Sequence, residues 1–255
     1  MTMQLATFST ATARGEHPAA DTLRQVIRGH DQLAPRSLQS SLGPSEIGEP
    51  CPRRLAYRLM GEQRVNTGSD PWPAIVGTAV HAWLAEAFLA ANTWLGRIRY
   101  LVETRVTIRE GLSGSCDLYD VDTARVIDHK VVGETAMREY KRNGPPQQYR
   151  AQAHLYGVGL ARLGLPVSEV CLAFYPRGGM LAGLHVWAEP FDPAIAAEAL
   201  ARHDRVLEAA CALDVDRHPD HYGHIPAATG HRCTWCPWFA PGTPVGATCP
   251  GHMAR

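Results

Sequence analysis

The sequence predicts an α/β (α+β) fold, because patterns typical of strands and helices alternate over most of its length. The strand patterns are short, rich in β-branched residues and bounded by turn residues. The helix patterns repeat apolar side chains every three or four residues. The predicted strands are 97–108, 115–121, 125–132, 170–175 and 184–188, and the predicted helices are 51–61, 75–91, 145–163 and 192–212.

Composition and charge exclude several classes of protein. Of the 255 residues, 45% are hydrophobic and 20% charged, as is ordinary for a globular protein. The formal net charge is zero, so any site for a polyanion must be a local patch. No apolar run reaches the roughly 18 residues of a membrane span, and no signal peptide is recognisable. We therefore expect a cytoplasmic protein without membrane contact. In that reducing compartment its seven cysteines suggest ligands of a metal or a cluster more than disulfides.

The segment 114–132 is predicted to be a hairpin with charged groups gathered on one face. Asp128 and Lys130 are two apart on the second strand and therefore project together. A turn at 122–124 would set Asp117 roughly opposite His129, close to both. Two carboxylates on one sheet face favour a divalent cation between them, although a salt-bridged surface hairpin is the alternative. Only two of the 25 basic residues are lysines, Lys130 and Lys141.

Other polar residues, taken one at a time, are weaker indicators of function. Residues 1–40 are expected to be a loosely ordered or weakly helical lead-in. Ser45 is expected to cap a helix within the helical segment 41–75. His81 lies in the first turns of a helix, where it packs more often than it binds a ligand. Gln152 and Tyr156 are four apart and share a helix face, either as a plain polar surface or beside phosphates or a carboxylate.

The tail, residues 213–255, is rich in Pro, Gly and His. Because it has few apolar residues, it needs a cross-link such as a bound metal centre to be stable. The spacing Cys233-x-x-Cys236 lets two sulfurs bind one metal centre, and Cys249 can be a third ligand. A fourth ligand must come from elsewhere, with Cys51 favoured and His231 and His252 as rivals. The other cysteines are expected to be buried, namely Cys116, Cys171 and Cys211.

Several common catalytic motifs are absent from the sequence. It contains no Walker-type phosphate loop, no G-x-G-x-x-G after a strand and no G-x-S-x-G. An H-E-x-x-H zinc-hydrolase motif is missing too. ATP-driven motors, dinucleotide enzymes and serine hydrolases therefore gain no support.

Taken in order, the motifs resemble a known superfamily. Over residues 42–250 the chain is similar to PD-(D/E)XK nucleases of the RecB type, most closely to CRISPR-associated and phage-borne RecB-like exonucleases with an iron–sulfur cluster. The resemblance implies a restriction-endonuclease-like core at 76–212, with a central mixed sheet flanked by helices, and a cluster-stapled subdomain formed by the two ends. The motifs are Cys51-Pro-Arg-Arg, His81, Asp117, Asp128-His-Lys130, Gln152-x-x-x-Tyr156, Cys233-x-x-Cys236 and Cys249.

The resemblance also implies a role for each matched residue. Lys130 would be the catalytic lysine. Gln152 and Tyr156 would support the active site and the DNA path. The implied ligands of Mg²⁺ or Mn²⁺ are His81, Asp117, Asp128 and the carbonyl of His129. The implied ligands of a [4Fe–4S] cluster are Cys51, Cys233, Cys236 and Cys249.

One feature departs from the family pattern. Twelve residues separate Cys236 from Cys249, whereas the family has a short gap. A loop can absorb the difference, but zinc with mixed Cys/His ligation and a lost cluster remain the alternatives to iron and sulfur.

The implied function is that of a metal-dependent DNA exonuclease acting on single-stranded DNA or DNA ends. Recombination and repair, phage DNA metabolism and CRISPR-type adaptation are the implied settings. Two alternatives remain open. The chain could be a non-catalytic module that uses a cluster or zinc to present a DNA- or protein-binding surface. It could also be a nuclease subunit active only beside a helicase, recombinase or integrase.

Overall fold

The structure is a computed structural model, and it describes residues 17, 19–33, 42–67, 70–228 and 233–251. The chain divides into two units, Met1–Ser41 and Leu42–Arg255. The described part of the first unit contains one helix, α1 (Ala19–Gln32). Its Leu23, Val26 and Ile27 follow helical spacing and are exposed.

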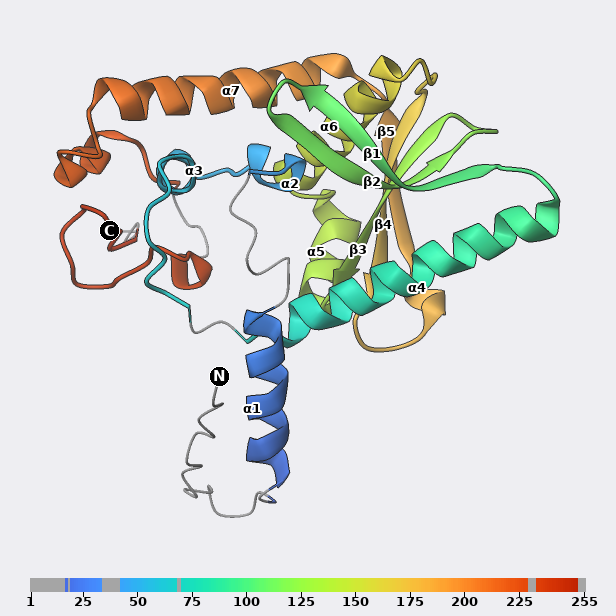
Figure 1. The fold of residues 1–255 in the computed structure, drawn as a ribbon, viewed down its shortest axis with the longest axis horizontal. Coiled ribbons are helices and arrows are strands. Elements are labelled where there is room, and N and C mark those ends of the chain that lie inside the picture. The colour runs from blue at the N-terminus through green and yellow to red at the C-terminus, as the bar shows by residue number, and fades with distance from the viewer. Residues whose placement is uncertain (1–16, 18, 34–41, 68–69, 229–232, 252–255) are drawn as a thin grey trace, which may run out of the picture. The chain divides into compact units, whose positions relative to one another are not determined.

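The second unit is built on one five-stranded sheet, in the order β1-β2-β3-β4-β5 (Figure 1). β3 and β4 run parallel, and the other neighbours are antiparallel. The predicted α/β fold with a central mixed sheet is therefore confirmed. The strands are β1 (Tyr100–Arg109), β2 (Leu112–Asp120), β3 (Arg125–Val132), β4 (Glu169–Pro176) and β5 (His185–Pro190).

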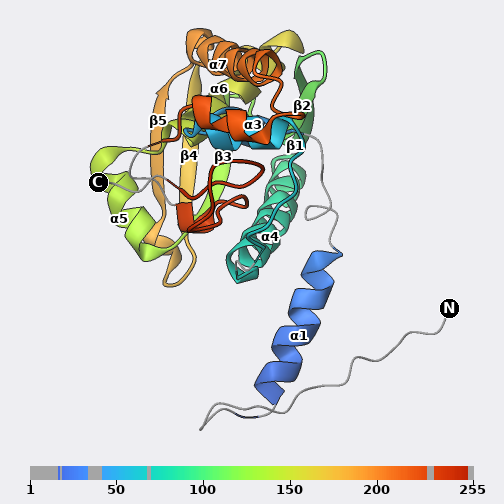
Figure 2. The same cartoon turned by 90° about the vertical axis from the view of Figure 1, so that its left-hand side faces the viewer.

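Helices cover both faces of the sheet (Figure 1 and Figure 2). Successive residues of β3 point to opposite faces. His129 stacks on Phe88 of α4, whereas Lys130 bonds to Gln152 of α6, so these two helices lie on opposite sides. The helices of this unit are α2 (Pro44–Ile47), α3 (Pro52–Leu59), α4 (Trp72–Leu95), α5 (Glu134–Asn143), α6 (Gln147–Arg162) and α7 (Pro193–Ala212), with short 3₁₀ turns η1 (Leu181–Gly183), η2 (Pro219–His224) and η3 (Cys233–Trp235).

Helix α2 begins two residues earlier than the sequence predicts. Ser45 is inside the helix and is not its cap; Gly43 is the N-cap, and Pro44 occupies the first position. Proline suits this place because its fixed φ is already helical and the first N–H needs no partner. The Glu46 carboxylate closes the turn by accepting the Gly43 N–H at 3.1 Å.

The central hairpin is shifted by one residue from the expected register. Tyr119 pairs with Val126 and Leu118 with Ile127, so Asp117 falls one residue away from its expected place opposite His129. The cause is the turn, which takes four residues, 121–124, and not three. Ala124 supports it with a left-handed φ of +52°.

Two cores hold the second unit together. The larger core lies between the sheet and α6. Helix and strand come close there, because a Cβ on Gly159 would lie 2.7 Å from Val106 of β1. The smaller joins α3, α7 and the tail through Tyr57, Tyr222 and Trp238. The Tyr57 hydroxyl also donates at 2.7 Å to the carbonyl oxygen of Gly246, which lies 189 positions later in the chain. The tail is thus packed onto the helix that follows Cys51.

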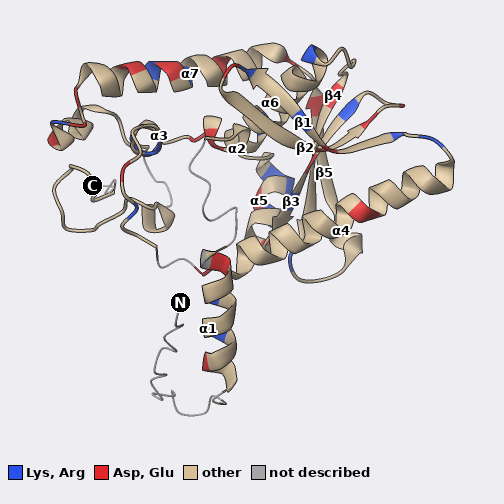
Figure 3. Cartoon of the chain, viewed as in Figure 1, with Lys and Arg blue, Asp and Glu red and all other residues tan. Residues whose placement is uncertain are grey.

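Helix α4 is the one described helix that is long and apolar enough, by length and composition, to cross a membrane. Its most apolar 18-residue window has a mean hydropathy of 1.5, and Figure 3 shows almost no charge along it. The sequence contains no apolar run of this length when only uninterrupted apolar residues are counted. In α4 the polar residues His81, Glu86 and Asn92 interrupt the run. Two of the three serve the fold, because Asn92 accepts the Arg99 N–H at 2.9 Å and His81 reaches Asp117. Length and composition alone are weak evidence for a span.

Candidate active site and cysteine site

Strand β3 places Asp128 and Lys130 on the same side, as predicted. The Lys130 ammonium pairs with the Asp128 carboxylate and donates to Oε1 of Gln152 at 3.1 Å. Its nitrogen also lies 5.0 Å from the centre of the Tyr149 ring, within reach of a cation–π contact. One ammonium therefore joins β3 to α6.

Asp128 is completely buried, and apart from the ion pair with Lys130 its oxygens have no hydrogen-bond partner among the described residues. Burial raises its pKa to about 6, Lys130 opposes that rise, and the Asp117 carboxylate adds to it. A buried carboxylate with unused lone pairs is costly in water-free surroundings unless a cation joins it. The Asp128 oxygens thus fit a metal ion in addition to the lysine.

Asp117 of β2 faces His81 of α4. Nδ1 of His81 lies 3.6 Å from Oδ2 of Asp117, and the same oxygen accepts the backbone N–H of His129 at 2.7 Å. The pKa of His81 is raised by its bond to Asp117. Burial pushes the pKa of Asp117 upward, but His81, Lys130 and the His129 N–H outweigh it, so the net pKa is lowered.

The structure adds Glu103 of β1 to this group. One ligand atom from each of His81, Glu103 and Asp117 lies within 4.8 Å of the others. Glu103 has a left-handed φ of +47° and a pKa raised first by burial and then by Asp117. Nothing in the sequence marked it, because a single acid in an alternating strand resembles a solvent-facing residue.

Gln152 and Tyr156 share the face of α6 that meets β3. Nε2 of Gln152 donates to the Tyr156 hydroxyl at 3.4 Å, and its Oε1 receives Lys130. Tyr156 is buried, which raises its pKa. The Gln152 amide thus forms hydrogen bonds to both the lysine and the phenol. Both predicted residues lie at the site.

The His129 side chain points toward α4, away from Lys130. It lies between Phe88 and Tyr175, whose hydroxyl is 3.3 Å from its Nδ1. Burial lowers its pKa to about 4, so the ring is neutral at neutral pH. The role expected for its backbone carbonyl stays a prediction.

The four predicted cluster cysteines line one pocket, which is separate from the sheet site. The backbone N–H of Ala228 donates to Cys51 Sγ at 3.4 Å, and Nη1 of Arg53 lies 3.7 Å from Cys249 Sγ. Hydrogen bonds of this kind orient the sulfur ligands of a metal centre. The rivals His231 and His252 lie outside the described residues. The cysteines in question are Cys51, Cys233, Cys236 and Cys249.

Comparison with known proteins finds similar structures but no similar sequences. No protein-family model matches the chain, and no curated protein matches it. An alkaline exonuclease (LHK-Exo) from Laribacter hongkongensis is 16% identical over 68% of this chain and 89% of its own, with a TM-score of 0.46. Its complex with dAMP is 16% identical over 73% and 95%, with a TM-score of 0.48. A phage related exonuclease from Haemophilus somnus 129PT is 14% identical over 65% and 82%, with a TM-score of 0.43.

The three arginines after Cys51 have structural partners. Arg58 pairs with Glu46 at 2.8 Å, and Arg54 pairs with Glu49 at 3.3 Å. Arg53 donates to the backbone carbonyl of Ile225 at 2.9 Å and so ties α3 to the tail. Their first role is to hold this subdomain together.

Two of the remaining cysteines are buried as expected, and one is not. Cys116 and Cys171 are buried on β2 and β4. Cys211 is exposed, contrary to the prediction. It occupies the last turn of α7, on the side that turns away from the smaller core, which receives Val206 and Ala210 instead.

Proposed function

We propose that the chain is a metal-dependent nuclease of the PD-(D/E)XK type that hydrolyses DNA phosphodiester bonds. The observation that carries the proposal is the position of the Lys130 ammonium between the buried Asp128 carboxylate and the Gln152 amide. Asp117, whose ligand atom groups with that of His81, is close enough to interact with the charges of both Lys130 and Asp128. A lone lysine paired with a carboxylate would suffice for a salt bridge. Metal-assisted hydrolysis needs more, namely carboxylate oxygens that are free to bind an ion and a histidine–carboxylate group near the lysine.

The residues present fit Mg²⁺ or Mn²⁺. Carboxylate oxygens are the ligands that these hard cations prefer, and imidazole suits Mn²⁺ as well. His81, Glu103 and Asp117 would hold the ion, with Asp128 supplying its unused oxygens. When bound, the ion would neutralise phosphate charge and lower the pKa of a nearby water.

The side chains around the ion would carry out the remaining steps, which are positioning the water and stabilising charge. As an ammonium, Lys130 would orient the attacking water or stabilise charge on the phosphate; to take the proton of that water at Nζ, it would have to be in its neutral amine form. Gln152 would hold that ammonium at a fixed place through its Oε1. Tyr156 would in turn hold the amide. The preference for single-stranded DNA or for ends comes from the sequence resemblance.

For the second site we propose a [4Fe–4S] cluster held by the cysteines that share the pocket. Four thiols converge there from two chain segments far apart in sequence, which suits a structural staple. Zinc would use the same thiols. Absorbance in the visible range separates the two, because a cluster is brown and a zinc site is colourless.

The deciding experiment is cleavage of end-labelled single-stranded and duplex DNA by anaerobically purified protein, with Mg²⁺, Mn²⁺ or EDTA. Asp128→Ala should abolish cleavage, and Asp122→Ala, in the exposed hairpin turn, is the matched control. Cleavage that needs metal and is lost only in Asp128→Ala supports the proposal, and the position of the label reports polarity.

Two other outcomes have their own meaning. DNA binding without cleavage by a folded, brown protein would replace the proposal with a non-catalytic module stapled by the cysteine site. Cleavage that starts only when a helicase, recombinase or integrase is added would make the chain a nuclease subunit.

A further inference from the structure

The tail carries a column of histidines that belongs to neither site described above. η2 is a 3₁₀ helix, with three residues in each turn, so side chains three apart lie one above another. His218, its N-cap, is followed at that spacing by His221 and His224. The ring centres of His218 and His221 are 5.0 Å apart, and those of His221 and His224 are 5.7 Å apart.

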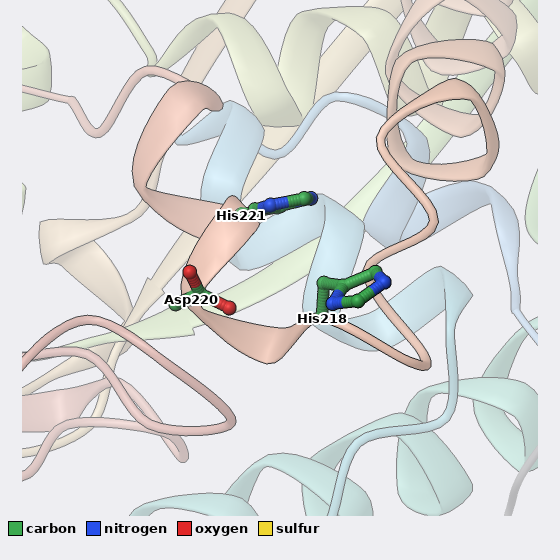
Figure 4. Close-up of side chains that lie close together, drawn as sticks. All are labelled: His218, Asp220 and His221. Atoms are coloured by element: carbon green, nitrogen blue, oxygen red, sulfur yellow. The ribbon is translucent and has the colours of Figure 1, made fainter.

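Asp220 brings a carboxylate to the same place. One ligand atom from each of His218, Asp220 and His221 lies within 4.8 Å of the other two. Figure 4 shows the three side chains. His218 and Asp220 are exposed and His221 is half-buried, so an ion can enter from solvent. Two imidazoles and one carboxylate with an open side form a typical ligand set for a divalent transition metal.

A backbone contact prepares His221 for this role. Its Nδ1 lies 2.7 Å from the carbonyl oxygen of Leu213. A carbonyl only accepts, so Nδ1 carries the proton, and Nε2 is the ring nitrogen that can offer a lone pair to an ion. Histidines that bind metals are commonly oriented in this way by a backbone carbonyl or a carboxylate.

The turn that carries these residues is held firmly. Tyr222, which directly follows His221, is fully buried; its ring centre lies 4.3 Å from that of Tyr57, and its hydroxyl donates to Glu62 at 2.9 Å. Arg53 donates to the carbonyl oxygens of Gly223 and Ile225. Ligands on a fixed turn lose little conformational freedom when an ion binds.

We propose that His218, Asp220 and His221 bind a divalent transition-metal ion, with Zn²⁺ as the probe that represents its class. The site uses none of the residues assigned to the nuclease or to the cysteine pocket. Because the turn packs on α3 through Tyr57, the ion would stabilise the packing of the tail on that helix.

Equilibrium dialysis of the full chain against Zn²⁺, followed by metal analysis, tests the proposal. The double variant His218→Ala/His221→Ala should retain one Zn²⁺ fewer per chain than the wild type. His17→Ala/His30→Ala, which removes two exposed histidines elsewhere, should retain the wild-type amount. Equal zinc in all three proteins overturns the proposal, whatever binds at the cysteines or at His81.

A second measurement uses the unaltered protein, so it does not depend on how the variant folds. Diethyl pyrocarbonate modifies accessible imidazoles, and mass spectrometry locates the products. Zn²⁺ should lower modification of His218 and His221 about tenfold and leave His17 and His30 unchanged. Equal modification with and without Zn²⁺ would overturn the proposal.

Discussion

The ammonium of Lys130 lies 3.1 Å from the amide oxygen of Gln152, a residue 22 positions later in the chain. This bond connects the middle of β3 to the middle of α6, across the crossover that leads to β4. The lysine is thus held from two directions, by the amide and by Asp128. Its place is determined by tertiary packing and not by the hairpin alone.

Lys130→Ala should lower metal-dependent DNA cleavage by about a hundredfold or more, while DNA binding persists. The reason is that the variant loses the group proposed to orient or deprotonate the water and keeps the groups proposed to hold the ion. Single-turnover cleavage and fluorescence anisotropy measure the two effects. Lys141→Ala, the other lysine of the chain and exposed at the end of α5, should behave like the wild type. Undiminished cleavage by Lys130→Ala would remove the mechanism.

Gln152→Leu should lower kcat about tenfold and leave KM nearly unchanged, because a hydrogen bond to a charged group is worth about 1.5 kcal/mol. Gln152 acts through Lys130, so the pH profile of kcat should shift as well. Gln147→Leu, on the exposed first turn of the same helix, is the control. A variant with lower kcat and an unmoved pH profile would assign Gln152 a purely structural role.

Glu103→Gln should weaken the activation of cleavage by Mn²⁺, because it removes one carboxylate from the group formed with His81 and Asp117. We expect the half-saturating Mn²⁺ concentration to rise about tenfold, in line with the loss of one ligand or ligand-supporting group. Titration of cleavage rate against Mn²⁺ measures this. Glu110→Gln, in the exposed turn between β1 and β2, should leave the titration unchanged. A wild-type titration for Glu103→Gln would exclude Glu103 from the metal site.

Cys51→Ser should lower iron content and melting temperature together, the latter by roughly 5 °C or more, since the proposed cluster would join Cys51 to the tail and a metal centre formed only in the folded state contributes to folding. Metal analysis and a thermal melt by circular dichroism are the measurements. Cys211→Ser is the matched control, because Cys211 is exposed and does not line the pocket. Loss of iron with an unchanged melting temperature would contradict the structural role.

Glu189 of β5 should contribute about 1 kcal/mol of stability at neutral pH, a value kept small because this carboxylate is partly solvated. It accepts from Arg150 at 2.7 Å and lies 2.9 Å from Nε2 of the buried His154. Burial raises its pKa, but Arg150 and His154 more than offset the rise, so its folded-state pKa is below the unfolded value. Its contribution is therefore present above the unfolded pKa and is lost as pH falls through the folded pKa.

Urea unfolding at pH 7 and pH 3 tests this sign. The difference in unfolding free energy between the wild type and Glu189→Gln should be positive at pH 7 and shrink at pH 3. Glu198→Gln, whose pair with Arg205 is exposed, should show little difference at either pH. A difference that grows toward pH 3 would contradict the assignment.

Local periodicity was sufficient for most of the elements. The strands of the central hairpin and helices α4, α6 and α7 were predicted within a few residues, because each carries a clear apolar pattern. Helix α5 was missed, since its only buried side chains, Met137 and Tyr140, form too short a pattern among charged neighbours. The register of β2 against β3 was one residue off, because turn length is set by backbone geometry that composition does not reveal.

The sequence by itself determined which candidate residues share a face or a short motif: Asp128 with Lys130 two apart on a strand, Gln152 with Tyr156 four apart on a helix, and the paired cysteines of the tail. Only the tertiary structure decided which of them meet. It brought Glu103 to His81 and Asp117, joined Lys130 to Gln152, and set Cys51 beside the tail. The physical reason is range: periodicity records which face of one element is buried, whereas these contacts depend on how separate elements pack against each other.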